Sequence, residues 1–323
     1  MFKRFAVGLA AGLSIAIVPA QADSAYPTAP IRLIVGQSAG SSVDAVARIM
    51  SERMSQSLGQ AIVVENRPGA NGVTATAYVA KARPDGYTLL FSGCSPMVFN
   101  PGLYKKLPYD PVKDFTYIAA VSENPFVMVA SKASGLKSFA DLTKEAKANP
   151  GKFTFASAGI GNSTQLATEL VAQRANFKLL HIPFSGSGPA LVAVIGGQVD
   201  LMSSVVGPAL PELKAGAATP LLIIGGDPIP ELPGVPGAKQ IGLDLPSLPT
   251  WTAVVGPAGL DPAVAKRLEQ AVQEALQDPK VQKQFKTQYL SAMNVPGPQM
   301  AARVATEIKL WKTLLHDFGI KPE

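Results

Sequence analysis

The 323-residue chain has almost none of the residues that most often perform catalysis or bind metals: two histidines, His181 and His316, and one cysteine, Cys94. A single cysteine forms no internal disulfide, and we expect Cys94 to be a packed or loop thiol and not a nucleophile. Neither H-E-x-x-H nor C-x-x-C spacing occurs, so no metal site is predicted. His181 lies in an apolar run and is interpreted as a strand-end residue, and His316 as a surface residue near the end of a helix. We therefore expect no catalytic residue.

Charge is also scarce, at 16% of the residues, and aromatic residues make up 7%. The chain has no dense Lys/Arg patch interleaved with aromatic residues, so we expect no nucleic-acid partner. A long apolar run, from Phe5 to Val18, occurs only at the start, between Met1-Phe2-Lys3-Arg4 and Ala20-Gln21-Ala22. This pattern predicts a signal peptide over residues 1–22 that is cleaved after Ala22, with an uncleaved anchor as the alternative. Without Lys3 and Arg4, 27 basic residues face 23 acidic ones, a formal charge of +4.

The remaining length of about 300 residues exceeds what one core usually serves, so two lobes are expected. Strand-like runs alternate with amphipathic helical patterns, which is typical of an α/β fold with mixed, mainly parallel sheets flanked by helices. We predict lobe 1 over residues 23–124, lobe 2 over 125–249, and a return to lobe 1 over 250–323. The expected crossings lie near Glu123 to Phe126 and in the Pro- and Gly-rich stretch from Asp227 to Pro249. Asp261-Pro262 and Asp278-Pro279 predict capped helix starts.

Within that return, Trp251 to Val255 is expected to form a strand. The other expected strands follow the two alternations and lie at 31–35, 62–65, 87–91, 126–130, 153–156, 179–182, 199–202 and 221–224.

Two Gly/Ser-rich joints, each between a β-branched run and an amphipathic stretch, are the main functional signal. They are Gly36-Gln37-Ser38-Ala39-Gly40-Ser41-Ser42 and Ser157-Ala158-Gly159-Ile160-Gly161-Asn162-Ser163-Thr164. Each is typical of a strand leading to a helix N-terminus, where unpaired N–H groups and the helix dipole favour a small anion. Such loops are also plain connections in many proteins, but a pair of them indicates one anionic ligand held between two lobes.

Two short strings match enzyme motifs in part. Gly93-Cys94-Ser95-Pro96-Met97 lacks the last glycine of a nucleophile elbow, although a hydrolase using Ser95 or Ser163 with His181 as base stays open. The joint at Gly159 and Gly161 lacks the third glycine of a dinucleotide fingerprint, and no acidic residue ends the following strand. We therefore expect no dinucleotide and no other cofactor.

Longer strings carry a resemblance to a known family. Val64-Glu65-Asn66-Arg67-Pro68-Gly69-Ala70 is followed by Pro84-Asp85-Gly86-Tyr87-Thr88-Leu89-Leu90 and by Asn100-Pro101-Gly102-Leu103-Tyr104 leading to Leu107-Pro108-Tyr109-Asp110-Pro111. Ala156-Ser157-Ala158-Gly159 and Gly196-Gly197-Gln198-Val199-Asp200-Leu201-Met202 complete the set. With these strings the chain resembles the Bug family, the solute-binding proteins of tripartite tricarboxylate transporters.

The resemblance implies a periplasmic two-lobe "Venus flytrap" that closes on a small organic carboxylate and delivers it to membrane permease subunits. We expect a monomer. The ligand-binding residues that the resemblance and the two joints imply lie in four loops and at one helix start. They are Gln37, Ser38, Ala39, Gly40, Ser41, Ser42 and Asp44; Ser92, Gly93 and Ser95; Ser157, Ala158, Gly159, Asn162, Ser163 and Thr164; and Phe184, Ser185 and Gly186.

The chain departs from the family pattern where ligand choice is set. Gln37, Ala39, Gly40 and Ser41 replace the usual aromatic, Pro, Gly and Gly residues of the first loop. Phe184-Ser185-Gly186 replaces a frequent Tyr-Lys-Gly, and Ser204 stands where an acidic residue is common. The ligand is therefore not identified, and an aromatic, hydroxylated or amide-bearing carboxylate fits as well as an aliphatic diacid. Presentation of the loaded protein to a membrane sensor is the alternative to transport.

Overall fold

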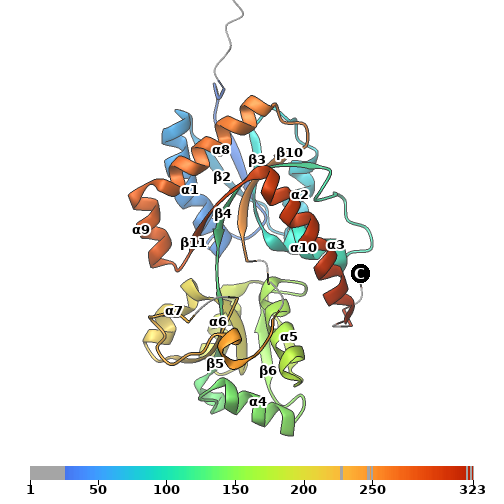
Figure 1. Cartoon of the computed structure of the whole chain (residues 1–323), viewed down its shortest axis with the longest axis vertical. Helices are drawn as coiled ribbons and strands as arrows, with labels where there is room; N and C mark the ends of the chain where they lie inside the picture. The colour runs from blue at the N-terminus through green and yellow to red at the C-terminus, as the bar shows by residue number, and fades with distance from the viewer. Residues whose placement is uncertain are drawn as a thin grey trace, which may run out of the picture.

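The computed structural model describes residues 26–225, 228–245, 248, 250–317, 319–320 and 322. The predicted signal peptide, residues 1–22, lies outside the described residues. Two sheets, each covered by helices on both faces, form two lobes stacked along the long axis of the molecule (Figure 1). Among the described residues, no helix is both long enough and apolar enough to cross a membrane.

The first lobe is built on a six-stranded sheet with the strand order β11-β4-β10-β3-β1-β2. Its first part contains β1 Ile31–Val35, α1 Ser42–Leu58, β2 Ile62–Asn66, α2 Val73–Ala80, β3 Thr88–Gly93, α3 Asn100–Leu103 and β4 Phe115–Glu123. A π-helical turn, Ser95–Phe99, leads into α3. The chain returns to this lobe with β10 Thr252–Pro257, α8 Pro262–Gln277, α9 Pro279–Thr287, β11 Ser291–Pro296 and α10 Gly297–Asp317.

The second lobe is built on a five-stranded sheet with the strand order β7-β6-β8-β5-β9. It contains β5 Phe126–Ser131, α4 Phe139–Ala148, β6 Thr154–Ser157, α5 Ser163–Ala175, β7 Leu180–Pro183, α6 Ser187–Ile195, β8 Leu201–Val205, α7 Val206–Lys214 and β9 Ala218–Ile224. Strand β5 shows why this sheet is sandwiched. Its residues are all buried and alternate between two apolar clusters, Phe126 and Met128 on the α5 side and Val127 and Val129 on the α7 side.

The prediction of two lobes with mixed sheets and flanking helices is confirmed, but "mainly parallel" overstates the parallel share. Among the described strands, β1 pairs in parallel with β2 and β3, and β6 with β7 and β8. The pairings of β4, β5 and β10 are antiparallel. Strand β4 is the last strand before the first crossing between the lobes, and β5 and β10 are the first strands after a crossing. The predicted lobe boundaries at 124/125 and 249/250 remain a prediction.

The predicted helix starts at Asp261 and Asp278 are confirmed, since each side chain accepts a hydrogen bond from its helix's first turn. Two strands were not predicted. Strand β4 lies inside the sheet, second from one edge, and β11 pairs with it as the edge strand. The C-terminal segment therefore contributes two strands, β10 and β11, as well as helices to the first lobe.

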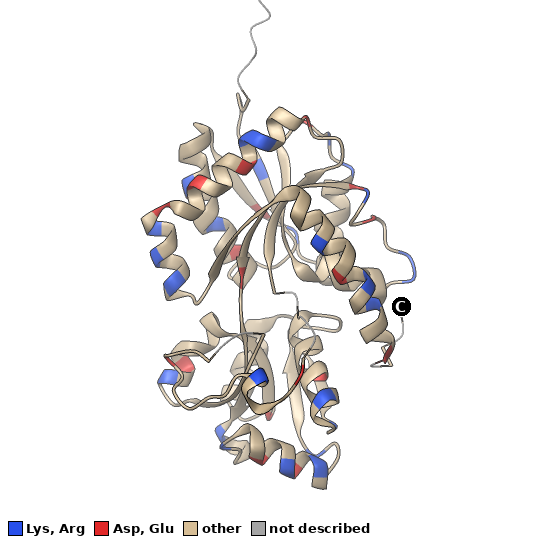
Figure 2. Ribbon diagram, in the orientation of Figure 1, with Lys and Arg blue, Asp and Glu red and all other residues tan. Residues whose placement is uncertain are grey.

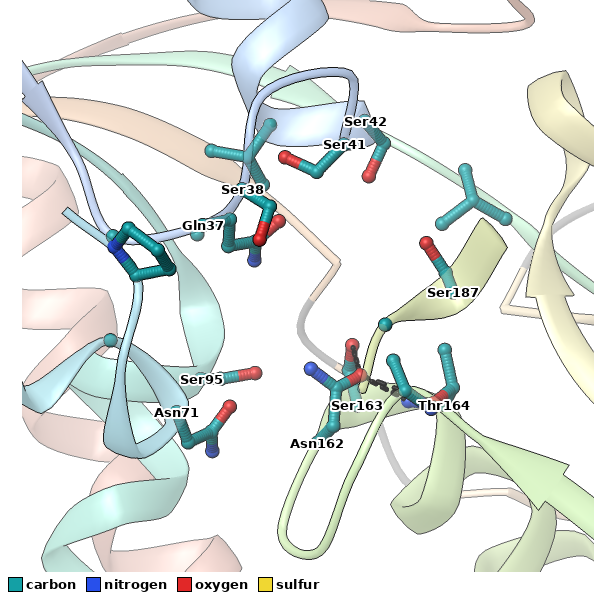
Figure 3. A pocket seen from close by; sticks show the side chains of 18 of the residues that line it. Gln37, Ser38, Ser41, Ser42, Asn71, Ser95, Asn162, Ser163, Thr164 and Ser187 are labelled. Carbon is teal, nitrogen blue, oxygen red and sulfur yellow. Dashed lines mark hydrogen bonds between the residues drawn. The ribbon is translucent and has the colours of Figure 1, made fainter. Parts of the chain in front are cut away.

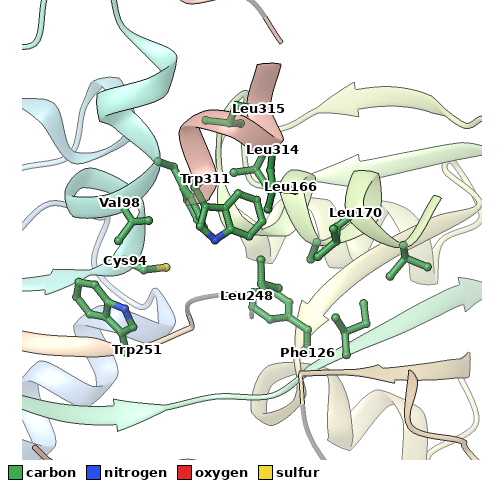
Figure 4. Packing of buried hydrophobic residues seen from close by; sticks show 14 of the residues in the cluster. Cys94, Val98, Phe126, Leu166, Leu170, Leu248, Trp251, Trp311, Leu314 and Leu315 are labelled. Carbon is green, nitrogen blue, oxygen red and sulfur yellow. The ribbon is translucent and has the colours of Figure 1, made fainter. Parts of the chain in front are cut away.

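One apolar cluster runs through both lobes on one side of their junction (Figure 4). Trp311, Leu314 and Leu315 of α10 belong to it together with Leu166 and Leu170 of α5. All five side chains are buried. Because α10 belongs to the first lobe and α5 to the second, this packing joins the lobes beside the two chain crossings.

Candidate functional site

A cavity of about 540 Å³ lies between the two lobes (Figure 3). Its lining comes from both lobes and from the crossings: Gly36 to Val43, Pro68 to Gly72, Gly93 to Ser95, Asn124, Phe126, Ala158, Asn162 to Thr164, Ser185 to Pro189, Val205 and Thr250 to Thr252. The two Gly/Ser joints found in the sequence therefore face the same cavity. None of the described lining residues is Lys, Arg, Asp, Glu or His. Lys, Arg, Asp and Glu lie mostly on the outer helices (Figure 2).

The first joint is held in place by a buried carboxylate behind it. Asp44 is 2% exposed, and its Oδ2 accepts hydrogen bonds from the N–H of Gly40 (2.9 Å) and from Arg48 Nε (3.0 Å). Its Oδ1 accepts from Asn66 Nδ2 at 2.9 Å. Burial acts to raise the pKa of Asp44, but the hydrogen bonds from Arg48, Gly40 and Asn66 outweigh it and hold that pKa below its usual value. Asp44 thus positions the loop and does not line the cavity.

At the N-terminus of α1, two main-chain N–H donors remain available to a ligand. Ser41 is the N-cap, and its Oγ accepts from the N–H of Asp44. The Ser41 N–H itself donates to the carbonyl of Ser38. The N–H groups of Ser42 and Val43 have no intrahelical acceptor at these positions, and both residues line the cavity. The hydroxyls of Ser38, Ser41 and Ser42 lie beside them (Figure 3).

The second joint satisfies most of its own donors. Asn162 caps α5 by accepting from the N–H of Thr164, and the Thr164 hydroxyl accepts from the N–H of Ala158. The N–H groups of Gly159 and Gly161 donate to Ser157 Oγ and Gln165 Oε1. This loop therefore contributes to the cavity mainly the main-chain N–H of Ser163, at the helix start, and the polar side chains of Asn162 and Ser163.

A third helix N-terminus, that of α6, opens on the same cavity. Its N-cap is Gly186, which offers no side-chain cap, and Ser187, Gly188 and Pro189 form the first turn. The N–H groups of Ser187 and Gly188 therefore have no intrahelical acceptor, and the dipole of α6 adds partial positive charge there. The start of α6 therefore leaves two main-chain N–H donors for a ligand, as many as the start of α1.

The wall at the crossings is largely apolar, and a partly buried ion pair lies behind it. Phe126, Val205 and Trp251 contribute to this wall, and Trp251 is 1% exposed. Trp251 Nε1 donates to Glu307 Oε2 at 2.8 Å, while Arg303 Nε lies 2.7 Å from Glu307 Oε1. Cys94 also lines the cavity, and burial raises the pKa of its thiol, so the thiol stays protonated.

Most of the residues predicted for binding lie on the cavity wall, but five do not. The fourteen that line it are Gln37, Ser38, Ala39, Gly40, Ser41, Ser42, Gly93, Ser95, Ala158, Asn162, Ser163, Thr164, Ser185 and Gly186. Asp44, Ser92, Ser157, Gly159 and Phe184 are not among the described lining residues. Ser92 and Ser157 are buried and bond to their own loops, at Gly93 O and Gly159 O.

His181 pairs with a different serine from the two considered for hydrolysis. Its Nε2 lies 2.6 Å from Ser157 Oγ, and its ring stacks on Phe155 with the ring centres 4.7 Å apart. Burial lowers the pKa of His181, which favours the neutral ring. Because Ser157 is fully buried, this pair supports the turn before α5 and offers no exposed nucleophile.

Three parts of the cavity wall were not predicted from the sequence: Pro68 to Gly72, the crossings between the lobes, and the start of α6. Pro68 and Gly69 served above only as part of a family string, and the segment that follows them reaches the other lobe: Asn71 Nδ2 donates to Gly161 O at 3.1 Å. One feature of the sequence could have predicted the start of α6. The string Gly186-Ser187-Gly188-Pro189 precedes an apolar run, and this pattern is typical of a helix with Pro in its first turn.

The chain matches one family model and is similar to known proteins over most of its length. The family model described as "Tripartite tricarboxylate transporter family receptor" matches residues 46–320. Protein BugT of Bordetella pertussis is 34% identical over 304 residues, covering 94% of this chain and 93% of BugT. The structure of R. palustris Rpa4515 with adipate is 27% identical with a TM-score of 0.86, covering 92% of this chain and 100% of that one. MatC (Rpa3494) from Rhodopseudomonas palustris with bound malate is 30% identical with a TM-score of 0.81, covering 90% and 100%.

Proposed function

This chain belongs to the tripartite tricarboxylate transporter receptor family and is a solute-binding protein, and from that premise we propose that it captures a small organic carboxylate between its lobes. It does so in the periplasm, as a monomer without catalytic activity. It then presents the ligand to the membrane permease subunits of a tripartite transporter. The carboxylates named in the two similar structures, adipate and malate, support this class of ligand.

The observation that carries the proposal is a cavity into which three helix N-termini open and whose described lining residues include none with a charged side chain. Neutral N–H and hydroxyl donors bind a carboxylate at roughly 1.5–3 kcal/mol per charge-assisted hydrogen bond. A micromolar dissociation constant requires about 8 kcal/mol, so roughly three to five such bonds suffice. The N–H groups of Ser42, Val43, Ser187 and Gly188, with the nearby serine hydroxyls, provide that number from both lobes. A ligand bound to both lobes favours their closed arrangement.

The test is a titration of the purified protein with adipate, malate, citrate and benzoate, followed by calorimetry and by tryptophan emission. Trp251 forms part of the cavity wall, so its emission should change with the calorimetric signal. Absence of heat and of an emission change with every organic anion would contradict the proposal. Hydrolysis of a generic ester that is lost in His181→Ala would favour the hydrolase instead.

A pair of variants at Ser187 isolates one main-chain donor. Ser187→Ala removes the hydroxyl and keeps the N–H, whereas Ser187→Pro removes both. Proline suits this first helical position, and Gly186 before it is extended, as proline requires. We expect the best carboxylate to bind Ser187→Pro about 10- to 100-fold more weakly than Ser187→Ala. Equal affinities of the two variants would remove the start of α6 from the site.

A further inference from the structure

A second groove lies on the second lobe, apart from the cavity between the lobes. It has a volume of about 640 Å³ and lies between the segments 137–147, 220–221 and 234–241, which contain most of α4, part of β9 and the turn that ends at Ile241. We call it the α4 groove. No described residue lines both this groove and the cavity. Helix α4 lies at the end of the second lobe that is remote from the first lobe (Figure 1), so the groove is separate from the carboxylate site proposed above.

The lining of the α4 groove is largely apolar, and part of it is open to solvent. Phe139, Leu221 and Val235 line the groove and are buried, and Pro220 beside them is half-buried. Ile241 also lines it, with 43% of its surface exposed. Pockets of about 300–1,000 Å³ with apolar walls and a few polar groups are typical sites for small organic molecules. The groove therefore has the size and the lining for a molecule with an apolar body.

The charged side chains of the groove all have the same sign. Lys137, Lys144 and Lys147 line it, and none of the described lining residues is Asp or Glu. Residues three and four apart lie on one face of a helix, so Lys144 and Lys147 share a face of α4 with Ala140 and Thr143, which line the groove as well. Because residues 138–140 also line it, the positive end of the α4 dipole lies at the groove.

No carboxylate of the described part of the chain neutralises these lysines. Within that part, none of the three ammonium groups has an ion-pair partner. The two acidic residues of α4 make other contacts: Asp141 Oδ2 accepts a hydrogen bond from the main-chain N–H of Lys137 at 3.1 Å, and Glu145 Oε2 lies 3.1 Å from Lys152 Nζ. The charge of the groove is therefore complementary to an anion.

Two larger occupants suit the groove less well. Strand β9 lies at the edge of its sheet, but a peptide strand cannot simply extend the sheet there, because the Ile223 N–H already donates to Pro236 O at 2.9 Å. A flat membrane surface would contact Ile241 and the lysines and leave the concave part of the groove unfilled. A small molecule fills the groove and meets the lysines at once.

We propose that the α4 groove binds a small amphiphilic organic anion, with an apolar alkyl or aryl body against the wall at Ile241 and a carboxylate, sulfonate or sulfate group beside the lysines. The inference goes beyond the proposed function, because it concerns a second site that does not need the lobes to close on a ligand. Lysine suits this role, since its ammonium group is a point charge on a flexible stem and imposes no fixed geometry on the anion. The groove should therefore select a class of anion and not one compound.

The experiment is calorimetry with probes below their critical micelle concentrations: octanoate, decanoate and decyl sulfate as anions, and decyltrimethylammonium as the cation of matched chain length. Two variants change the groove. Lys144→Glu/Lys147→Glu reverses the charge of one wall, and Ala140→Trp places a large side chain at an exposed position of the groove face.

The chain offers a matched control for each variant. Lys132→Glu/Lys178→Glu changes two exposed lysines of the same lobe that are not among the described lining residues, and Ala148→Trp changes an exposed alanine at the other end of α4. Ser187→Pro, which weakens the cavity between the lobes, shows whether a probe binds in that cavity instead. Thermal unfolding without a probe shows whether each variant folds.

We expect the anions to bind and the cation not to bind. Each CH₂ group that enters the groove should tighten binding by up to about fourfold, so decanoate should bind more tightly than octanoate. Lys144→Glu/Lys147→Glu should weaken decyl sulfate about 5- to 50-fold at low salt, and added salt should reduce this difference. Ala140→Trp should weaken it about tenfold or more. The two control variants and Ser187→Pro should bind as the wild type does.

Four results would overturn the inference: no binding of any of these anions, binding of the cation as tight as that of decyl sulfate, affinities unchanged in both groove variants, or binding that is lost in Ser187→Pro and kept in Ala140→Trp. Binding to vesicles that contain phosphatidylglycerol, without binding of the free anions, would overturn it in favour of a membrane surface. If Ala140→Trp does not fold, Lys144→Glu/Lys147→Glu and its control decide. None of these results bears on the carboxylate in the cavity between the lobes, which the titrations above test.

Discussion

Gly207 lies where the two lobes touch, and adding one methyl group there should weaken ligand binding. Gly207 belongs to α7 of the second lobe, and Gln288 follows α9 of the first. A Cβ at position 207 would overlap the carbonyl oxygen of Gln288 and lie 3.1 Å from its carbonyl carbon. The Gln288 main chain has little freedom to move, because its N–H donates to Gln284 O and Phe285 O. In Gly207→Ala the lobes must therefore separate at this point.

Overpacking of this kind costs about 1–3 kcal/mol. Separation of the lobes relieves the overlap, so the cost falls on the closed arrangement, and the affinity for a carboxylate should drop about 5- to 150-fold. Calorimetry with the tightest carboxylate measures the affinity, and thermal unfolding without ligand should change little. The control is Gly256→Ala, whose added methyl would meet Leu260 and Leu89 within the first lobe; it should lower stability and leave affinity near wild type. Wild-type affinity in Gly207→Ala, or a loss of stability without a loss of affinity, would refute the reasoning.

Three further predictions concern the support of the cavity and its reporter. Asp44→Asn should lose about 2 kcal/mol of unfolding free energy at pH 7 in urea titrations, because an amide NH₂ replaces one oxygen of a buried carboxylate that accepts hydrogen bonds from Gly40, Arg48 and Asn66. The pKa of Asp44 is lower in the folded protein than in the unfolded chain, so the stability difference between the wild type and Asp44→Asn should persist down to about pH 4, the unfolded pKa. It should vanish as the pH falls through the folded pKa. A stability difference that persists in strong acid would contradict this. Because burial lowers the pKa of His181, wild-type stability should fall as the pH drops below about 6.5, and His181→Gln should flatten this slope. Trp311→Phe leaves Trp251 as the one tryptophan of the chain and should retain the ligand-dependent emission change; loss of the change would place the reporter elsewhere.

Local signals predicted much of the fold, and their failures have a physical pattern. The starts of α8 and α9 follow from Asp261 and Asp278, because capping residues act within one turn of the chain. Strand β4 and its antiparallel partner β11 were missed because their pairing joins segments more than 160 residues apart. The share of parallel strands was overestimated for the same reason. The strands next to a crossing are not joined to their sheet neighbours by βαβ units, and they pair antiparallel.

The site was predictable where a loop precedes a helix, and not where the wall depends on tertiary structure. The joints around Ser41 and Ser163 do share one cavity. The roles of Asp44 and Ser157 differ from those expected, because their side chains bond to the loops from behind. Asn124 was not predicted at all, because only the meeting of the two crossings places it on the wall.

The central claim is that uncharged donors from both lobes hold a carboxylate, and the most direct measurement is a crystal structure of the complex with the tightest-binding carboxylate. The account predicts the carboxylate oxygens within hydrogen-bond distance of the first-turn N–H groups of α1 or α6 and of the hydroxyls beside them, with no Lys or Arg in contact. A carboxylate bound by a Lys or Arg side chain, or bound outside the cavity between the lobes, would contradict it.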